Sequence, residues 1–135
     1  MREILFRGKR IDNGEWVYGS LWINIDEVYI LSAANCVGIE VDPKTVGQYT
    51  GLTDKNGKKI FEGDILHVVS ECCDYDFKTS VGAKYGYVSG FYVDGDFGDG
   101  DFTEIGYAFD YWENEDAEVE VISNIHDNPE LLEER

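Results

Sequence analysis

Hydrophobic and polar positions alternate along this chain in short runs that are separated by turn residues. β-Branched and aromatic residues recur in these runs at a spacing of two, which is typical of strands. The pattern predicts strands at residues 3–10, 15–25, 28–31, 37–41, 45–50, 65–69 and 118–122. In the longest run, Trp16, Tyr18 and Trp22 fall on one face, and Gly19 indicates a bend or bulge. No segment up to residue 69 has hydrophobic positions with a 3.6-residue period, so the pattern predicts β-sheet for this half of the chain.

The second half is more aromatic and richer in glycine. Residues 70–78 are polar and predict a loop, whereas residues 81–93 predict one strand with bends at Gly86 and Gly90. Residues 102–112 predict a further aromatic strand, which we expect to pair with 81–93 across the acidic stretch 94–101. Pro129 suits the first turn of a short C-terminal helix.

Three pairs of residues predict tight turns. Asn13-Gly14 and Asn56-Gly57 are hairpin turns, and for the second we expect a two-residue type I′ turn with its polar neighbours in water. Gly63-Asp64 breaks a strand, because glycine accepts a positive φ and the carboxylate can accept hydrogen bonds from nearby backbone N–H groups. An apolar residue, a Gly-Asp turn and a new strand in succession are common in small SH3-like barrels.

The segment around the last two turns also resembles a known family. Residues 48–65 are Gln-Tyr-Thr-Gly-Leu-Thr-Asp-Lys-Asn-Gly-Lys-Lys-Ile-Phe-Glu-Gly-Asp-Ile, and they resemble the YopX family of phage and prophage proteins. The ends of the chain, residues 2–7 and 119–132, resemble the opening and closing strands of that family, whereas residues 70–116 carry no recognised similarity. The resemblance implies an all-β, barrel-like fold and a phage or prophage origin. It implies no known activity and no catalytic residues.

We therefore predict a single all-β domain over residues 1–135. Curled antiparallel sheets are expected to form an SH3-like or related complex barrel that ends in a short C-terminal helical turn. A chain of 135 residues with 43% hydrophobic content is long enough to bury one core.

Charge is distributed unevenly along the chain. Residues 1–60 carry 8 Lys/Arg and 8 Asp/Glu, whereas residues 61–135 carry 3 Lys/Arg and 20 Asp/Glu, which is the whole net charge of −17. Such a field repels phosphates, so direct binding of nucleic acid is not expected. The acidity favours a basic protein partner or cations, or it serves only to keep the chain soluble.

The sequence offers few candidate residues for metal binding or catalysis. Asp94, Asp96, Asp99 and Asp101 could supply oxygen ligands to Ca²⁺ or Mg²⁺, but their spacing departs from an EF-hand loop and favours a solvated turn. The two histidines and three cysteines match no zinc pattern, and no phosphate-binding or nucleophile motif is present. We expect no cofactor and no enzymatic activity. The absence of an apolar leader or a run of about 20 apolar residues predicts a cytoplasmic protein that does not cross a membrane.

These observations predict a phage-derived accessory protein that acts through protein–protein contacts and self-association. The alternative is an acidic DNA mimic that binds a basic host nuclease or DNA-binding protein. Aromatic and acidic side chains are the candidate interaction surface: Trp22, Tyr85, Tyr87, Tyr92, Asp94, Asp96, Asp99 and Asp101.

Overall fold

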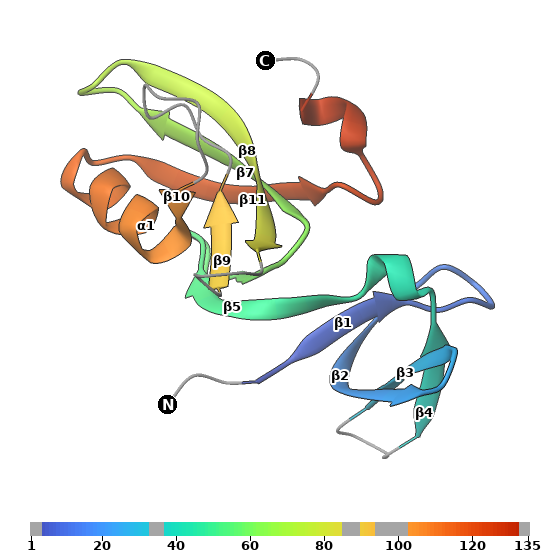
Figure 1. Ribbon diagram of the computed structural model, residues 1–135. Coiled ribbons are helices and arrows are strands. Elements are labelled where there is room, and N and C mark those ends of the chain that lie inside the picture. Colours follow the sequence, from blue (N-terminus) through green and yellow to red (C-terminus); the bar gives the residue numbers. More distant parts are fainter. Residues whose placement is uncertain (1–3, 33–36, 85–89, 94–102, 133–135) are drawn as a thin grey trace. The chain divides into compact units, whose positions relative to one another are not determined.

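The computed structural model describes residues 4–32, 37–84, 90–93 and 103–132 (Figure 1). The chain folds into two compact units, Met1–Leu52 and Thr53–Arg135. Strands dominate both units, and all strand ladders among the described residues are antiparallel. The predicted all-β class is confirmed.

The first unit is an antiparallel sheet in which the first four strands pair in succession and the fifth returns to pair with the first. Within this unit the spatial order is β4-β3-β2-β1-β5. The elements are β1 (Phe6–Lys9), β2 (Trp16–Asn24), β3 (Glu27–Leu31), β4 (Gly38–Val41), the 3₁₀ turn η1 (Pro43–Thr45) and β5 (Gly47–Thr53).

The sheet of the first unit curls back on itself. A bridge between Arg10 and Val41 brings the end of β4 to the end of β1, and Asp42 N donates to Lys9 O at 2.8 Å. Ile30 and Val41 are fully buried. The expectation of curled antiparallel sheets is thus confirmed, although the ladders of the described residues do not close into a barrel.

Gly19 is the point at which β2 changes partner. Residues 16–19 pair with β1, and residues 20–24 pair with β3. A Cβ atom on Gly19 would lie 2.0 Å from the backbone oxygen of Leu31, so only glycine permits this approach. The predicted bend at Gly19 therefore has a steric cause.

The second unit holds a five-stranded sheet with the order β10-β9-β8-β7-β11. Its elements are β6 (Lys59–Phe61), β7 (Asp64–Ser70), β8 (Tyr75–Lys84), β9 (Gly90–Val93), β10 (Thr103–Glu104), α1 (Ile105–Asn114), β11 (Glu118–Asn124) and the 3₁₀ turn η2 (Pro129–Leu132). The last of these is the predicted C-terminal helical turn.

The prediction of a strand over residues 102–112 is wrong beyond its first residues. β10 does pair with β9, but α1 begins at Ile105. Ile105, Ala108 and Trp112 are buried at the spacing i, i+3 and i+7, which is a helical spacing. The buried Trp112 ring lies 6.0 Å from the ring of Phe77 in β8. This packing outweighs the strand propensity of the aromatic residues.

Two further predictions in the second half are wrong. The predicted loop 70–78 is a turn only over Glu71–Asp74, and β8 begins at Tyr75. Residues 81–93 are not one strand, because β8 and β9 pair with each other and Val81 lies opposite Val93. The first error arises because the apolar positions at the start of β8 alternate with charged ones, which suggested a loop.

The predicted turns occur where expected, but the type of the second differs. Gly14 and Gly57 have φ of 75° and 80°. Asn56 is not among the described non-glycine residues with positive φ, so the turn is not type I′. Gly57 N donates to Asp54 O at 3.0 Å and Asp54 N donates to Lys58 O at 2.9 Å. These bonds define a three-residue hairpin loop with a type I turn and a left-handed glycine.

The Gly63-Asp64 turn behaves as predicted. Gly63 has φ of 95°, and the buried Asp64 Oδ2 accepts a hydrogen bond from Phe61 N at 2.7 Å. Gly63 N also donates to Val81 O, and Ile125 N donates to Gly63 O. One turn therefore connects segments that are distant along the chain.

The close approach at Gly19 yields a direct test. Gly19→Ala should lower the free energy of unfolding by about 2–3 kcal/mol, because the added methyl displaces the backbone of β3. Gly82→Ala is the matched control, since nothing lies within 4 Å of a Cβ at that strand position. It should be neutral or stabilising by about 0.5 kcal/mol. Urea unfolding monitored by Trp fluorescence measures both, and equal stabilities of the two variants would contradict the steric account.

Candidate functional site

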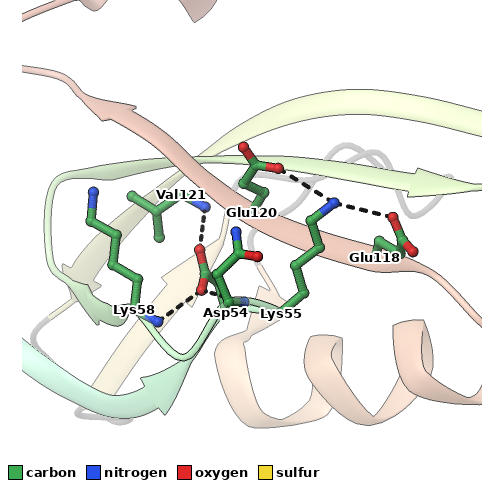
Figure 2. A network of polar contacts seen from close by, with 7 residues as sticks. Asp54, Lys55, Lys58, Glu118, Glu120 and Val121 are labelled. Atoms are coloured by element: carbon green, nitrogen blue, oxygen red, sulfur yellow. Dashed lines mark hydrogen bonds and ion pairs between the residues drawn. The ribbon is translucent and has the colours of Figure 1, made fainter.

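The carboxylate of Asp54 organises the start of the second unit. Oδ1 accepts hydrogen bonds from Asn56 N and Lys58 N, and Oδ2 accepts one from Val121 N, all at 2.9 Å (Figure 2). Next to it, Lys55 N donates to Val119 O at 2.9 Å. The loop therefore occupies the hydrogen-bonding groups on the edge of β11 that faces away from β7. An edge strand is covered in this way.

Asp54 is buried, with 7% of its surface exposed, although its sequence context predicted a solvated tip. Burial alone would raise the pKa of its carboxyl group, but the three backbone N–H donors outweigh this effect and the pKa lies below its ordinary value. The native state therefore holds Asp54 as a carboxylate. Sequence reasoning missed this role, although an Asx-type turn before Asn-Gly was a usable signal.

Lys55 extends from the same loop over the outer face of β11. Its Nζ lies 3.2 Å from Glu118 Oε2 and 3.4 Å from Glu120 Oε2 (Figure 2). These ion pairs raise the pKa of Lys55. All three side chains are substantially exposed, so we expect the pairs to orient Lys55 rather than to stabilise the fold strongly.

An open groove of about 600 Å³ lies beside this loop, within the second unit. Apolar groups from α1 and the start of β11 line it together with a rim of charged side chains. The lining residues are Thr53, Asp54, Lys55, Phe109, Trp112, Glu113, Asp116, Ala117, Glu118 and Val119.

The rim of the groove includes the C-terminal end of α1, which is acidic. Ala117 N donates to Trp112 O and Asp116 N donates to Glu113 O, the bonds of a Schellman motif. Asp116 occupies the left-handed position with φ of 52°, where glycine is favoured. The last turn contains no basic residue. Carboxylates at Glu113, Glu115 and Asp116 therefore lie at the negative end of the helix dipole, where negative charge is unfavourable.

The turn between β7 and β8 contacts the same helix end. Ser70 Oγ and Cys72 Sγ donate to Glu115 O at 2.7 and 3.0 Å, and Tyr75 OH donates to Glu115 Oε1 at 3.0 Å. Burial and this carboxylate raise the pKa of Tyr75. Hydrogen bonds with Cys72 and Glu115 raise the pKa of Cys73 to about 11, so its thiol is protonated at neutral pH.

Among the described residues, His67 does not share a site with Cys72 and Cys73. His67 Nε2 lies 2.6 Å from Asp76 Oδ1, whereas Cys72 contacts Cys73 and Glu115, so they have different partners in the described part of the chain. Within the described residues, no three His, Cys, Asp or Glu side chains come together as a metal site. No helix in the described segments is long and apolar enough to span a bilayer.

In the first unit, exposed apolar side chains gather on the hairpin of β2 and β3. We call residues 21–29 the hairpin arm. Trp22, Ile23 and Ile25 expose 49%, 63% and 91% of their surface. Trp22 packs against Tyr29 on one face, with ring centroids 5.1 Å apart, and Ile23 pairs with Val28 on the other. Of the predicted interaction residues, Trp22 lies on this arm.

The side chains of the other predicted interaction residues lie outside the described part of the structure. Tyr92 belongs to β9 and pairs with Gly82, but its side chain lies outside the described part of the structure. The remaining residues fall outside the described segments: Tyr85, Tyr87, Asp94, Asp96, Asp99 and Asp101.

Comparison with known proteins identifies the family. A family model described as YopX protein matches residues 5–133. The chain belongs to the YopX family. The crystal structure of protein EF1440 from Enterococcus faecalis is similar in fold to this YopX-family chain, with a TM-score of 0.56 and 23% identity over 98% of this chain and 99% of that one. None of the curated proteins matches the chain.

Removing the charge of Asp54 tests its role in the YopX fold. In Asp54→Asn the amide NH₂ must face at least one backbone N–H, so we expect a loss of about 2–3 kcal/mol in the free energy of unfolding at pH 7. Asp110→Asn, an exposed change on α1, should stay within about 0.5 kcal/mol.

The difference in the free energy of unfolding between the wild type and Asp54→Asn should change with pH in one direction. Because the native pKa of Asp54 is lowered, its carboxylate stabilises the fold above the ordinary aspartate pKa. That contribution disappears as the pH falls through the native pKa. Urea unfolding at several pH values should show the wild type and Asp54→Asn converging in acid, and a constant difference would contradict the assignment.

Substitution of Asp116 provides a second test, in which we expect the variant to be more stable than the wild type. Asp116→Gly should raise the free energy of unfolding by about 1 kcal/mol, because glycine accepts the left-handed conformation and a negative charge leaves the helix end. Asp116→Asn removes only the charge and should give the smaller part of this gain. Thermal unfolding measures both, and a destabilised glycine variant would contradict this description of the helix end.

Proposed function

We propose that this YopX-family chain is a phage- or prophage-derived accessory protein of the bacterial cytoplasm that acts by contact with other proteins and self-associates. It carries out no chemistry and needs no cofactor. The observation that supports self-association most strongly is the hairpin arm, which exposes large apolar side chains on both of its faces.

The apolar groups of the arm are concentrated on one hairpin. Single exposed apolar side chains are ordinary, whereas a contiguous set marks an interaction site. Trp22 and Tyr29 offer aromatic rings, which are enriched in protein interfaces, and Ile23 and Ile25 extend the patch. A second copy of the arm would cover surface that otherwise faces water.

The backbone conformation of Ile25 adds an energetic argument for self-association. It has φ of 50°, a conformation that is costly for a β-branched residue, and it is almost wholly exposed. Asparagine or glycine would fit this turn position better. Isoleucine therefore costs stability in the isolated chain, and an apolar contact of its side chain offsets that cost.

Charge favours the first unit as the self-association surface. Its residues 1–52 contain 5 Lys/Arg and 7 Asp/Glu, a net charge of −2, whereas residues 53–135 contain 6 and 21, a net charge of −15. Two copies can approach through nearly neutral surfaces with little repulsion. Contact through two strongly acidic surfaces would be unfavourable.

The alternative proposal is an acidic DNA mimic that occupies a basic host nuclease or DNA-binding protein. It needs carboxylates on one continuous surface. The bonds from Ser70 and Tyr75 to Glu115 hold the β7–β8 turn, with Glu71 and Asp74, beside the acidic end of α1. Carboxylates from two separate segments thus gather at one end of the second unit, which favours a basic partner.

Self-association is tested by removing the apolar contact without damaging the fold. Ile25→Asn relieves the backbone conformation, so we expect it to raise the melting temperature while it shifts the sedimentation coefficient toward that of a monomer. Trp22→Ser should have the same effect on association. Sedimentation velocity between about 10 and 300 µM covers the range of weak contacts.

Ile11→Asn is the matched control. Ile11 is 58% exposed in the same unit but belongs to the β1–β2 turn, outside the arm. It should leave association unchanged. A wild-type protein that remains monomeric at the highest concentration, or equal losses in Ile11→Asn and Ile25→Asn, would exclude the arm as the interface.

A further inference from the structure

We infer that the groove of the second unit is a docking site for an arginine-rich segment of a partner protein. The floor of the groove is apolar, since Trp112 and Val119 are buried and Phe109 and Ala117 are half-buried beside it. The groove is open, so it suits a side chain presented by another macromolecule better than an enclosed small molecule. This inference rests on the proposed action by protein contact, but not on self-association through the hairpin arm.

The charge on the rim determines which segment fits. Glu113, Asp116 and Glu118 contribute three carboxylates. Among the described residues that line the groove, the one cation is Lys55, which is already held by Glu118 and Glu120. The Asp54 carboxylate is directed to backbone N–H groups and contributes little to the groove. The carbonyl end of α1 adds partial negative charge. The potential in the groove is therefore negative.

Arginine matches this combination of an apolar floor and an acidic rim. Its methylene stem can lie on Ala117 and Phe109 while its guanidinium group reaches two carboxylates, and it also stacks on an aromatic ring. Lysine offers the charge without the planar stacking group. An apolar segment would desolvate the rim carboxylates without compensation.

The other classes of occupant fit less well. A nucleic acid would bring phosphates into a unit with a net charge of −15. A metal ion would need several converging ligands, and within the described residues no group of three is present. A second copy of this chain would bring another strongly acidic unit.

Fluorescence anisotropy with a labelled nine-residue peptide of alternating Arg and Ser tests the inference on the full chain. We expect saturable binding at 50 mM NaCl that weakens about tenfold or more by 300 mM, because the contact is electrostatic and exposed. The equivalent Lys-Ser peptide should bind about threefold or more weakly, since it lacks the stacking group.

Matched variants distinguish peptide binding in the groove from general attraction to the acidic unit. Glu113→Gln with Asp116→Asn should raise the Kd for the Arg peptide about tenfold and also raise the melting temperature, which excludes unfolding as the cause. Glu71→Gln with Asp74→Asn removes the same charge from the neighbouring turn, outside the groove, and should change Kd by less than about threefold. Phe109→Leu keeps an apolar floor and should remove the preference for Arg over Lys.

Two outcomes would overturn the inference. One is the absence of binding by the wild type at 50 mM NaCl, and the other is an equal loss of affinity in the two double variants, which would indicate diffuse electrostatic attraction. Sedimentation of the wild-type protein, measured alongside peptide binding, keeps the tests distinct. A wild type that associates through the hairpin arm but does not bind the Arg peptide would contradict the groove inference alone.

Discussion

The second unit depends on one buried carboxylate. Asp54 accepts hydrogen bonds from three backbone N–H groups, two in its own loop and one in β11. Without this acceptor, the amide of Val121 and the amides of the loop would be left without a partner in a buried place, which is costly. The same contact lays the loop along the edge of β11 and so forms one wall of the groove.

The carboxylates at the C-terminal end of α1, which also line the groove, have different surroundings from Asp54. Asp54 is a carboxylate that its surroundings stabilise, and its pKa is lowered accordingly. Glu113 and Asp116 lie at the wrong end of a helix dipole, and Asp116 also holds a conformation that favours glycine. Proteins commonly sacrifice stability at positions that serve binding. Ile25 in the first unit likewise has an unfavourable backbone conformation and an exposed side chain, as the proposed self-association would require.

The sequence predicted those features that depend on local chemistry. The left-handed glycines at 14, 57 and 63 and the role of Asp64 follow from turn chemistry, and the strands of the first half follow from alternation. The family resemblance was carried by the same segment, residues 48–65, and the match over residues 5–133 confirms it.

Features that depend on tertiary contacts could not be predicted from local sequence chemistry in the same way. α1 was missed because its aromatic residues favour strands, although the spacing of Ile105, Ala108 and Trp112 is helical and could have indicated it. The groove combines residues 53–55 with 109–119, and no local pattern joins them. The burial of Asp54 depends on Val121, 67 positions away.

The most direct test of this account is an NMR titration of the Asp54 carboxyl carbon, recorded together with the amide signals of Asn56, Lys58 and Val121. We expect a midpoint below the ordinary aspartate value of 3.8, shared by the carboxyl and all three amides. A midpoint at or above 3.8, or a Val121 amide that does not follow the titration, would contradict the central role of Asp54.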